Sequence, residues 1–350
     1  EMRLVKNTVI RNVTVSSDNG HGVNLHGTEN AVIDGLTVEK AGKAGISLAN
    51  AVNVTIENTE ALSENCSWGS VAMMFAEGEA YKNPVSIVYG EGNDIDYIYA
   101  DERNAEGYEG VNSIHFEAEY SGAIAGDIRE VSVSEGVDVP ETFKYAASVN
   151  GAYFTTINGA IEAANDGDTV KCAPGTYDEN IVFGDKSITL EGAQAGVKPD
   201  GENRTDDFRE TILTGTISTA NGGTTADAFN ADQKIVVDGF KFEGDGLKVG
   251  DCSYSTVGSL TVKNCIMTFG DNAEDTIEGY GNNTYNYFVK ISSVSPEASV
   301  TVEDNYVTGN PPAINDTAYV YPLQLWGVKE VSVKNNNIIL GEESADNLID

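Results

Sequence analysis

A repeat of 23 residues is the feature that most restricts how this chain can fold. Asn7, Asn30 and Asn53 stand 23 residues apart, and each opens a similar segment: NTVIRNVTV, NAVIDGLTV and NVTIENTEA. A unit of this length holds about three short strands with their turns, which is too little to bury its own apolar face. Stacking such units at roughly 4.8 Å, the distance between paired strands, buries a continuous column. The repeat therefore predicts a β-strand solenoid.

A second set of residues marks a bend that follows a short apolar strand in each unit. Asn, Asp and Gly tolerate a positive φ, so their recurrence predicts a stacked turn. Stacked Asn side chains can also hydrogen-bond along the column. The same pattern returns in the second half of the chain, where the turn positions first keep nearly the same spacing and then lie further apart. The predicted turn ladder consists of Asn12, Gly35, Asn58, Gly192, Gly215, Gly239, Asn264, Asp304 and Asn335.

Two stretches carry a resemblance to a known family. In residues 153–193, four apolar residues share one helical face before the helix-ending Asp166-Gly167-Asp168: Ile157, Ala160, Ile161 and Ala164. This stretch looks like the N-terminal start of a right-handed parallel β-helix of the pectin-lyase-like type, in which a short helix caps the column. Residues 19–71 resemble the closing rungs of β-helices in modular bacterial surface proteins. The resemblance implies an all-β fold: a right-handed parallel β-helix solenoid with a capping helix near 155–165.

A start motif in the middle of the chain predicts two β-helices in series. We expect residues 1–76 to be the C-terminal rungs of a first β-helix and residues 77–145 to form a β-rich cap and linker. Residues 146–350 then form a second β-helix that begins with its capping helix. Residue 1 lies inside a rung, and an uncovered rung end would aggregate. We therefore expect either that the chain is part of a longer modular protein or that a partner covers this end.

Charge restricts the partners of this chain. There are 55 Asp and Glu residues against 21 Lys and Arg, for a formal net charge of -34. This charge repels phosphate, so nucleic acid and an anionic membrane are not expected partners. The apolar runs are too short for a membrane span. The four cysteines show no metal-binding spacing, and the sequence indicates no certain cofactor.

The motif Gly20-His21-Gly22 resembles one rung of polygalacturonases. Glycoside hydrolysis also needs two carboxylates beside the scissile bond, and the family carries a downstream Arg-Ile-Lys. The next rung here reads Lys43-Ala-Gly-Ile-Ser-Leu, so that motif is missing. The start at 153–193 is also similar to pectin methylesterases, but the paired Gln residues of an oxyanion hole are not found. No catalytic residue is predicted.

Insertion length predicts a binding site in the second β-helix. The rungs 264–304 and 304–335 are longer than the repeat, and solenoids place such insertions on one face. Aromatic faces beside amides suit sugar rings, and carboxylates suit Ca²⁺. The predicted glycan-binding residues are Tyr280, Tyr285, Tyr287, Tyr319, Tyr321 and Asn282, and the predicted Ca²⁺ ligands are Asp271 and Asp275. The alternative is a surface loop with its own tyrosine core. Trp68 and Trp326 are interpreted as packing residues.

The leading functional hypothesis is a non-catalytic extracellular module of a bacterial cell-surface protein, adhesive and glycan-binding. Its expected partner is a carbohydrate or a ligand on a host or cell surface. The first alternative is a lyase or glycoside hydrolase acting on uronic-acid polymers, although a negative surface disfavours polyanionic substrates. The second alternative is a structural stalk. The fold alone does not decide among them.

Overall fold

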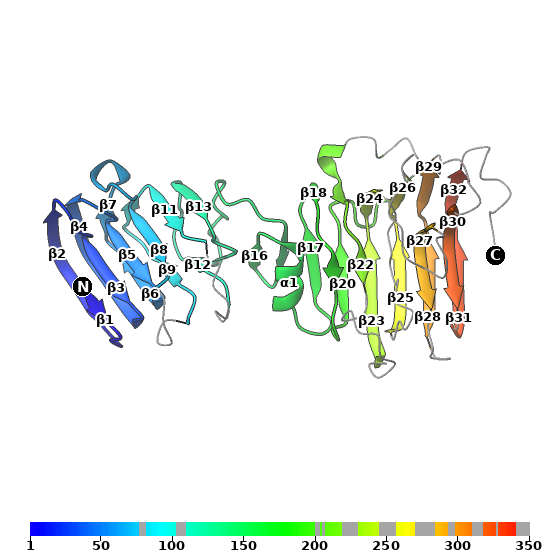
Figure 1. Cartoon of the computed structure of the whole chain (residues 1–350), viewed down its shortest axis with the longest axis horizontal. Helices are drawn as coiled ribbons and strands as arrows, with labels where there is room; N and C mark the ends of the chain where they lie inside the picture. The colour runs from blue at the N-terminus through cyan, green and yellow to red at the C-terminus, as the bar shows by residue number, and fades with distance from the viewer. Residues whose placement is uncertain are drawn as a thin grey trace. The chain divides into compact units, whose positions relative to one another are not determined.

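The computed structural model describes residues 1–76, 82–102, 110–199, 204, 207–218, 230–244, 257–269, 284–292, 298–309, 318–326 and 328–340. The chain divides into two compact units. The first consists of Glu1–Tyr145 with Gly151–Thr155, and the second of Ala146–Asn150 with Thr156–Asp350. Parallel strands stacked rung upon rung make up most of both units (Figure 1). The predicted all-β, parallel β-helix fold is confirmed.

Two long parallel sheets form the first unit. The first sheet contains, in order, β1 (Met2–Arg3), β3 (Val23–His26), β5 (Ile46–Ala49), β8 (Val71–Met74), β11 (Tyr97–Ala100) and β13 (Ala123–Gly126). The second contains β2 (Val9–Ser17), β4 (Glu29–Ala41), β6 (Val52–Glu57), β9 (Ser86–Tyr89), β12 (Ser113–Phe116) and β14 (Glu130–Val133). The short strand β7 (Glu60–Ala61) pairs in parallel with β4, and the short strand β10 (Asp94–Ile95) pairs in parallel with β7. β16 (Ala152–Phe154) closes this unit antiparallel to β14.

Columns of apolar side chains fill the interior of the first unit. Every second residue of a strand points to the same face, and the parallel register places equivalent residues on top of one another. Leu25, Leu48, Met73 and Ala100 stack in this way across β3, β5, β8 and β11, and all four are fully buried. Each rung therefore completes the core of its neighbours, as the repeat predicted.

An asparagine ladder runs along the first unit at the residues that define the repeat. The Asn30 Nδ2 donates to Asn7 Oδ1 at 3.3 Å, and the Asn53 Nδ2 donates to Asn30 Oδ1 at 2.8 Å. All three residues have φ of 55–56°, the left-handed conformation that Asn tolerates. Each amide thus links one rung to the next.

Seven residues of the predicted turn ladder also have left-handed φ, between 50° and 77°: Asn12, Gly35, Asn58, Gly239, Asn264, Asp304 and Asn335. Gly192 and Gly215 do not. These two are glycines for a different reason, because a Cβ at Gly192 would lie 2.5 Å from the Gly239 carbonyl oxygen. At Gly215 it would lie 2.1 Å from that of Glu179. Close approach of neighbouring backbones, rather than φ, requires glycine there.

Residues 77–145 were predicted as a cap and linker, but their described strands continue the sheets of the first unit. β9 pairs in parallel with β6 and with β12, and β12 pairs in parallel with β14. The spacing explains why the repeat is not visible in this part of the sequence. Ser113 pairs with Ser86 on one side and with Glu130 on the other, and the first interval along the chain is much longer than the second. Because the turns differ in length, the strands stack regularly although their spacing in the sequence is irregular.

The second unit contains α1 (Ile157–Ala163) near its start, which confirms the predicted capping helix. Thr156 caps it by accepting a hydrogen bond from the Gly159 N–H at 3.0 Å, and Ile157, Ala160 and Ile161 are buried. The first sheet consists of β15 (Ala147–Val149), which is antiparallel to the next strand, and then of parallel β17 (Thr169–Cys172), β20 (Ile188–Glu191), β23 (Asn230–Asp238), β25 (Val257–Lys263), β28 (Ser299–Glu303) and β31 (Glu330–Lys334).

The second sheet of this unit is also parallel. It contains β18 (Gly175–Tyr177), β21 (Thr211–Leu213), β24 (Phe240–Gly244), β26 (Ile266–Phe269), β29 (Tyr306–Gly309) and β32 (Asn337–Leu340). Two further pairs of parallel strands belong to this unit. They are β19 (Ile181–Val182) with β22 (Ile217–Ser218), and β27 (Thr284–Ser292) with β30 (Ala318–Trp326). The short 3-10 helices are η1 (Ser63–Asn65) in the first unit and η2 (Asp207–Arg209) in the second.

Candidate functional site

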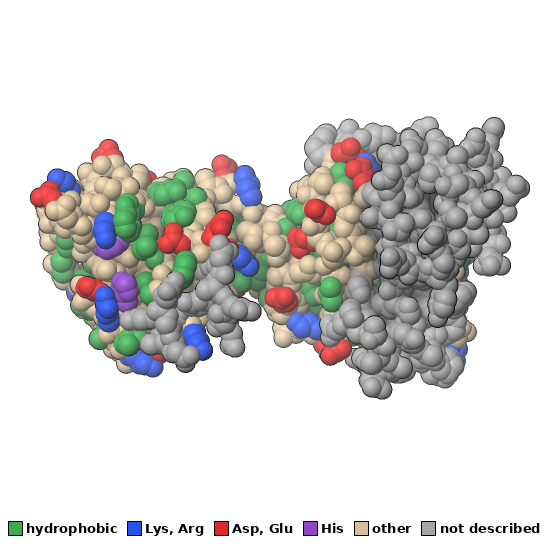
Figure 2. Space-filling model, viewed as in Figure 1, with side chains coloured by type: hydrophobic (Ala, Val, Ile, Leu, Met, Phe, Trp, Pro, Cys, Tyr) green, Lys and Arg blue, Asp and Glu red, His purple; other side chains and the backbone are tan. Residues whose placement is uncertain are grey.

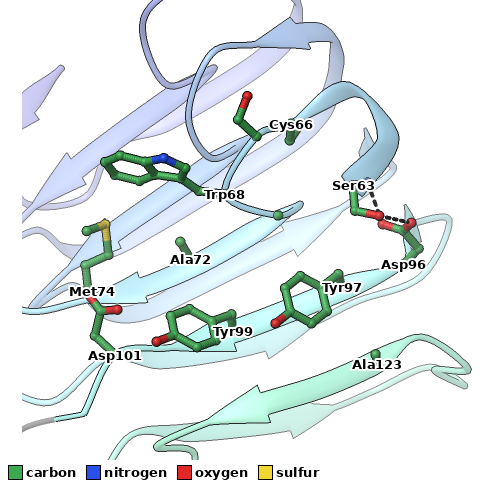
Figure 3. A pocket seen from close by; sticks show the side chains of 12 residues that line it. Ser63, Cys66, Trp68, Ala72, Met74, Asp96, Tyr97, Tyr99, Asp101 and Ala123 are labelled. Atoms are coloured by element: carbon green, nitrogen blue, oxygen red, sulfur yellow. Dashed lines mark hydrogen bonds between the residues drawn. The ribbon is translucent and has the colours of Figure 1, made fainter.

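A surface cavity of about 890 Å³ lies in the first unit, beside β8 and β11. Figure 2 shows hydrophobic side chains gathered on the face of this unit over these strands. Figure 3 shows three aromatic side chains around the cavity, Trp68, Tyr97 and Tyr99. The remaining lining residues are Ser63, Cys66, Ser67, Gly69, Ala72, Met74, Asp96, Asp101 and Ala123.

The alternation of β11 places the two tyrosines on the outer face. Ile98 and Ala100 point into the core, with 1% and 0% exposure, so Tyr97 and Tyr99 point outward and are half-buried. The register places small residues beside them: Ala72 of β8 next to Tyr99, and Ala123 of β13 next to Tyr97. These small neighbours leave room on the outer face beside the tyrosine rings, where the cavity lies.

Trp68 rises over this sheet from the loop that follows η1. Its side chain is 46% exposed, with the His21 ring edge-on at a centroid distance of 5.3 Å. The Lys43 Nζ lies 4.9 Å from the centroid of the Trp68 ring, which is a cation–π contact. Gly69 has φ of 99°, and a Cβ there would lie 2.5 Å from the Tyr97 ring. Glycine therefore allows the Trp68 loop to approach Tyr97.

Asp96 fastens this loop to the start of β11. Its carboxylate accepts hydrogen bonds from the Ser63 N–H at 2.7 Å, from the Ser63 hydroxyl at 2.6 Å and from the Ser70 hydroxyl. Partial burial opposes ionisation, but these three donors outweigh it and lower the pKa of Asp96. The carboxylate is thus ionised at neutral pH and holds the segment that carries Trp68.

Asp96→Asn should therefore destabilise the first unit in a pH-dependent way. The loss should be about 1 kcal/mol near pH 7, because the side chain is solvent-exposed and water screens its contacts. The folded-state pKa lies below the unfolded one, so this contribution is present above the ordinary Asp pKa of about 3.9 and disappears as the pH falls below it. Urea unfolding of wild type and variant at pH 7 and pH 3 measures this difference.

Asp94→Asn is the matched control for that measurement. Asp94 is an exposed carboxylate two residues away, and within the described part of the chain its side chain makes none of the hydrogen bonds seen at Asp96. Its substitution should leave stability nearly unchanged at both pH values. A loss of equal size in the two variants, or one that persists at pH 3, would contradict the role given to Asp96.

Cys66 and His21 are the other ionisable side chains of chemical interest around the cavity. Burial, with a contribution from Asp96, raises the pKa of the Cys66 thiol, so it is not a reactive thiolate at neutral pH. Burial, with a contribution from Lys43, lowers the pKa of His21. Its ring is therefore neutral at pH 7 and packs against Trp68. The histidine of the Gly20-His21-Gly22 motif therefore has a packing role.

The site predicted in the second unit is described only through its backbone. β27 and β30 pair so that Tyr285 lies next to Tyr319 in the register, and Tyr287 next to Tyr321. These tyrosines therefore occupy neighbouring rungs. Tyr280, Asn282, Asp271 and Asp275 lie outside the described residues. Among the residues that are described, no group of three or more His, Cys, Asp or Glu side chains could hold a metal ion.

The cavity of the first unit was not predicted from the sequence. Trp68 was interpreted as a packing residue, whereas almost half of its side chain is exposed. Tyr97 and Tyr99 fell in residues 77–145, which were predicted as a cap and linker. The available signal was the alternation Tyr97-Ile98-Tyr99, which places two aromatic rings on the outer face of a strand. What the sequence did not reveal is that the Trp68 loop lies beside them.

Residues 2–111 match the family model described as a right handed beta helix region. This segment contains the Trp68 loop and β11, so the cavity lies almost entirely inside the matched region. No curated protein and no solved structure matches the chain. Within the part of the chain that the structure describes, no helix is long and apolar enough to cross a membrane.

Proposed function

Starting from a right-handed parallel β-helix with an aromatic cavity on its outer face, we propose that this protein is a non-catalytic carbohydrate-binding module. The observation that carries the proposal is the grouping of Trp68, Tyr97 and Tyr99 around one cavity. Aromatic rings offer flat apolar faces, and sugar rings offer apolar C–H faces together with hydroxyls. The Ser67 hydroxyl and the Asp101 carboxylate lie at the same cavity and supply hydrogen-bonding groups.

The carboxylates of the cavity support binding rather than hydrolysis. Asp96 and Asp101 flank β11 on its two ends, five positions apart, so their Cα atoms are roughly 16 Å apart across this extended segment. Glycoside hydrolases place their two carboxyl groups about 5 to 10 Å apart. The hydrogen bonds from Ser63 and Ser70 also keep Asp96 ionised, so it is not a general acid. This pair does not have the geometry for cleaving a glycosidic bond.

The setting that we propose is the surface of a bacterial cell, where the module acts in adhesion. Two features support it: the resemblance of residues 19–71 to modular surface proteins, and the formal net charge of -34. A strongly negative surface keeps a protein soluble and disfavours nucleic acid. Two alternatives have distinct outcomes in a binding assay. An enzyme on uronic-acid polymers would release fragments, and a structural stalk would bind no glycan.

Tyr99→Ala tests the proposal. The full chain should bind one or more members of a glycan array, and the variant should bind them about 30-fold more weakly, because a buried aromatic contact contributes about 2 kcal/mol. Titration calorimetry on the best array ligand measures the two dissociation constants. Tyr145→Ala is the control, since Tyr145 is an exposed tyrosine of the same unit that packs on Tyr153 rather than lining the cavity.

Three results would contradict the proposal. Equal affinities in wild type and Tyr99→Ala would place binding elsewhere on the chain. Glycan fragments released by the wild-type protein, detected by mass spectrometry, would establish an enzyme. Absence of binding to all glycans on the array would favour the stalk.

A further inference from the structure

The geometry of Tyr97 and Tyr99 restricts the shape of the ligand. Their ring centroids are 6.4 Å apart, and the ring planes differ by only 20°. Figure 3 shows the two rings side by side along β11. Two nearly parallel rings that are two residues apart on one strand form a platform of two successive aromatic rings, with its long direction along the strand. Such a platform suits two successive sugar rings of an extended chain better than it suits a single sugar.

Small side chains flank Tyr99 on both neighbouring strands. The neighbours of Tyr99 in the register are Ala72 and Ala125, so no large side chain of an adjacent strand crosses the platform there. Trp68 stands beyond Ala72 and flanks the platform on one side (Figure 3). The Lys43 ammonium is placed against the Trp68 ring. A ligand is thus bounded laterally by Trp68 and lies lengthwise on the tyrosines.

The charges around the platform select against anionic ligands. Asp96 lies at one end of β11 and Asp101 at the other, and both line the cavity. A polysaccharide that carries one carboxylate per ring would place like charges near both ends, at a cost that grows as water is excluded. Sugar hydroxyls, in contrast, can donate hydrogen bonds to the Asp101 carboxylate.

Resting on the carbohydrate-binding function proposed above, we infer that the ligand is an uncharged, β-linked pyranose chain lying lengthwise along β11. Chains with equatorial β-1,4 links form flat ribbons whose successive rings present apolar C–H faces. Two such faces in succession match the two successive, nearly parallel rings of Tyr97 and Tyr99. Chains with α-1,4 links coil instead, so two successive rings do not lie flat on one plane. Uronic-acid chains have a carboxylate on each ring.

The experiment compares three hexasaccharides on the full chain: cellohexaose, maltohexaose and hexagalacturonate. By titration calorimetry, cellohexaose should bind at least about tenfold more tightly than the other two, and affinity should rise from cellobiose to cellotetraose as both rings become covered. Tyr97→Ala and Tyr99→Ala should each lose about tenfold or more. Tyr99→Phe should retain most of the affinity, because it keeps the ring, and it controls for misfolding of the alanine variant. Asp101→Asn should reduce the discrimination against hexagalacturonate.

The outcomes separate this inference from the proposed function. Tighter binding of maltohexaose or hexagalacturonate that is lost in Tyr99→Ala would overturn the inferred ligand class and keep the carbohydrate-binding function. Binding of cellohexaose that is unchanged in both alanine variants would overturn the platform. Absence of binding to all three hexasaccharides and to the wider array would overturn both.

Discussion

Replacing Arg204 with Met is expected to lower the free energy of unfolding of the second unit by about 3–5 kcal/mol. Arg204 and Glu210 form a bidentate ion pair in which both side chains are 1% exposed. Arg204 also donates to the backbone carbonyls of Val197, Asn264 and Gly239. The substitution leaves a buried carboxylate without its counter-charge and deprives three carbonyls of a donor, and both effects are costly in a low-dielectric interior.

Urea unfolding, followed by circular dichroism, measures the loss. The double variant Arg204→Met, Glu210→Met should recover much of it, because it removes both charges together. Lys198→Met is the surface control. Lys198 pairs with Asp304 at 2.7 Å, but its side chain is 53% exposed, so its loss should be below about 1 kcal/mol. Equal losses for Arg204→Met and Lys198→Met, or a double variant less stable than the single one, would contradict this account.

Gly239→Ala should also be strongly destabilising, by roughly 3 kcal/mol or more. Gly239 follows β23 with φ of 77°, a region that costs a residue with a Cβ about 1–2 kcal/mol. The added methyl group would lie 2.2 Å from the backbone nitrogen of Ala195 and 2.3 Å from the carbonyl carbon of Gln194. Backbone atoms cannot rotate away as a flexible side chain can, so two neighbouring rungs would have to separate.

Gly167→Ala is the matched control, because it has the same strain without the steric clash. Gly167 has φ of 86°, and no heavy atom of the described chain lies within 4 Å of the position of its Cβ. Its cost should be about 1–2 kcal/mol. Thermal unfolding of both variants separates the contribution of φ from that of close packing. If Gly239→Ala were no more destabilising than Gly167→Ala, the close approach of the rungs would not need glycine.

The fold was predictable because its main signals are periodic. Asn7, Asn30 and Asn53 recur every 23 residues, and the structure joins their side chains into a hydrogen-bonded ladder. The capping helix was predictable from one apolar face and a short polar stop, and α1 buries Ile157, Ala160 and Ile161. In a solenoid each unit contacts only its neighbours, so a local pattern is enough to predict the stacking of strands.

Other features were decided by contacts between rungs, which no local pattern records. The stacking continues through β9, β12 and β14 although the intervals between them along the chain are unequal, because hydrogen bonding between strands tolerates turns of different length. Gly192 and Gly215 were predicted as part of the turn ladder from their positions in the sequence. What requires glycine there is an approaching carbonyl from another rung.

The repeat thus established the column of strands and its asparagine ladder, since both depend on residues a constant distance apart in the chain. Only the tertiary structure brought Trp68, Tyr97 and Tyr99 to one cavity. Trp68 reaches the tyrosines because Ser63 and Ser70 donate to Asp96, and because Gly69 lets its loop approach Tyr97. Each of these contacts joins residues of successive rungs. Such residues are far apart in the sequence, so only the stacking of the rungs brings them together.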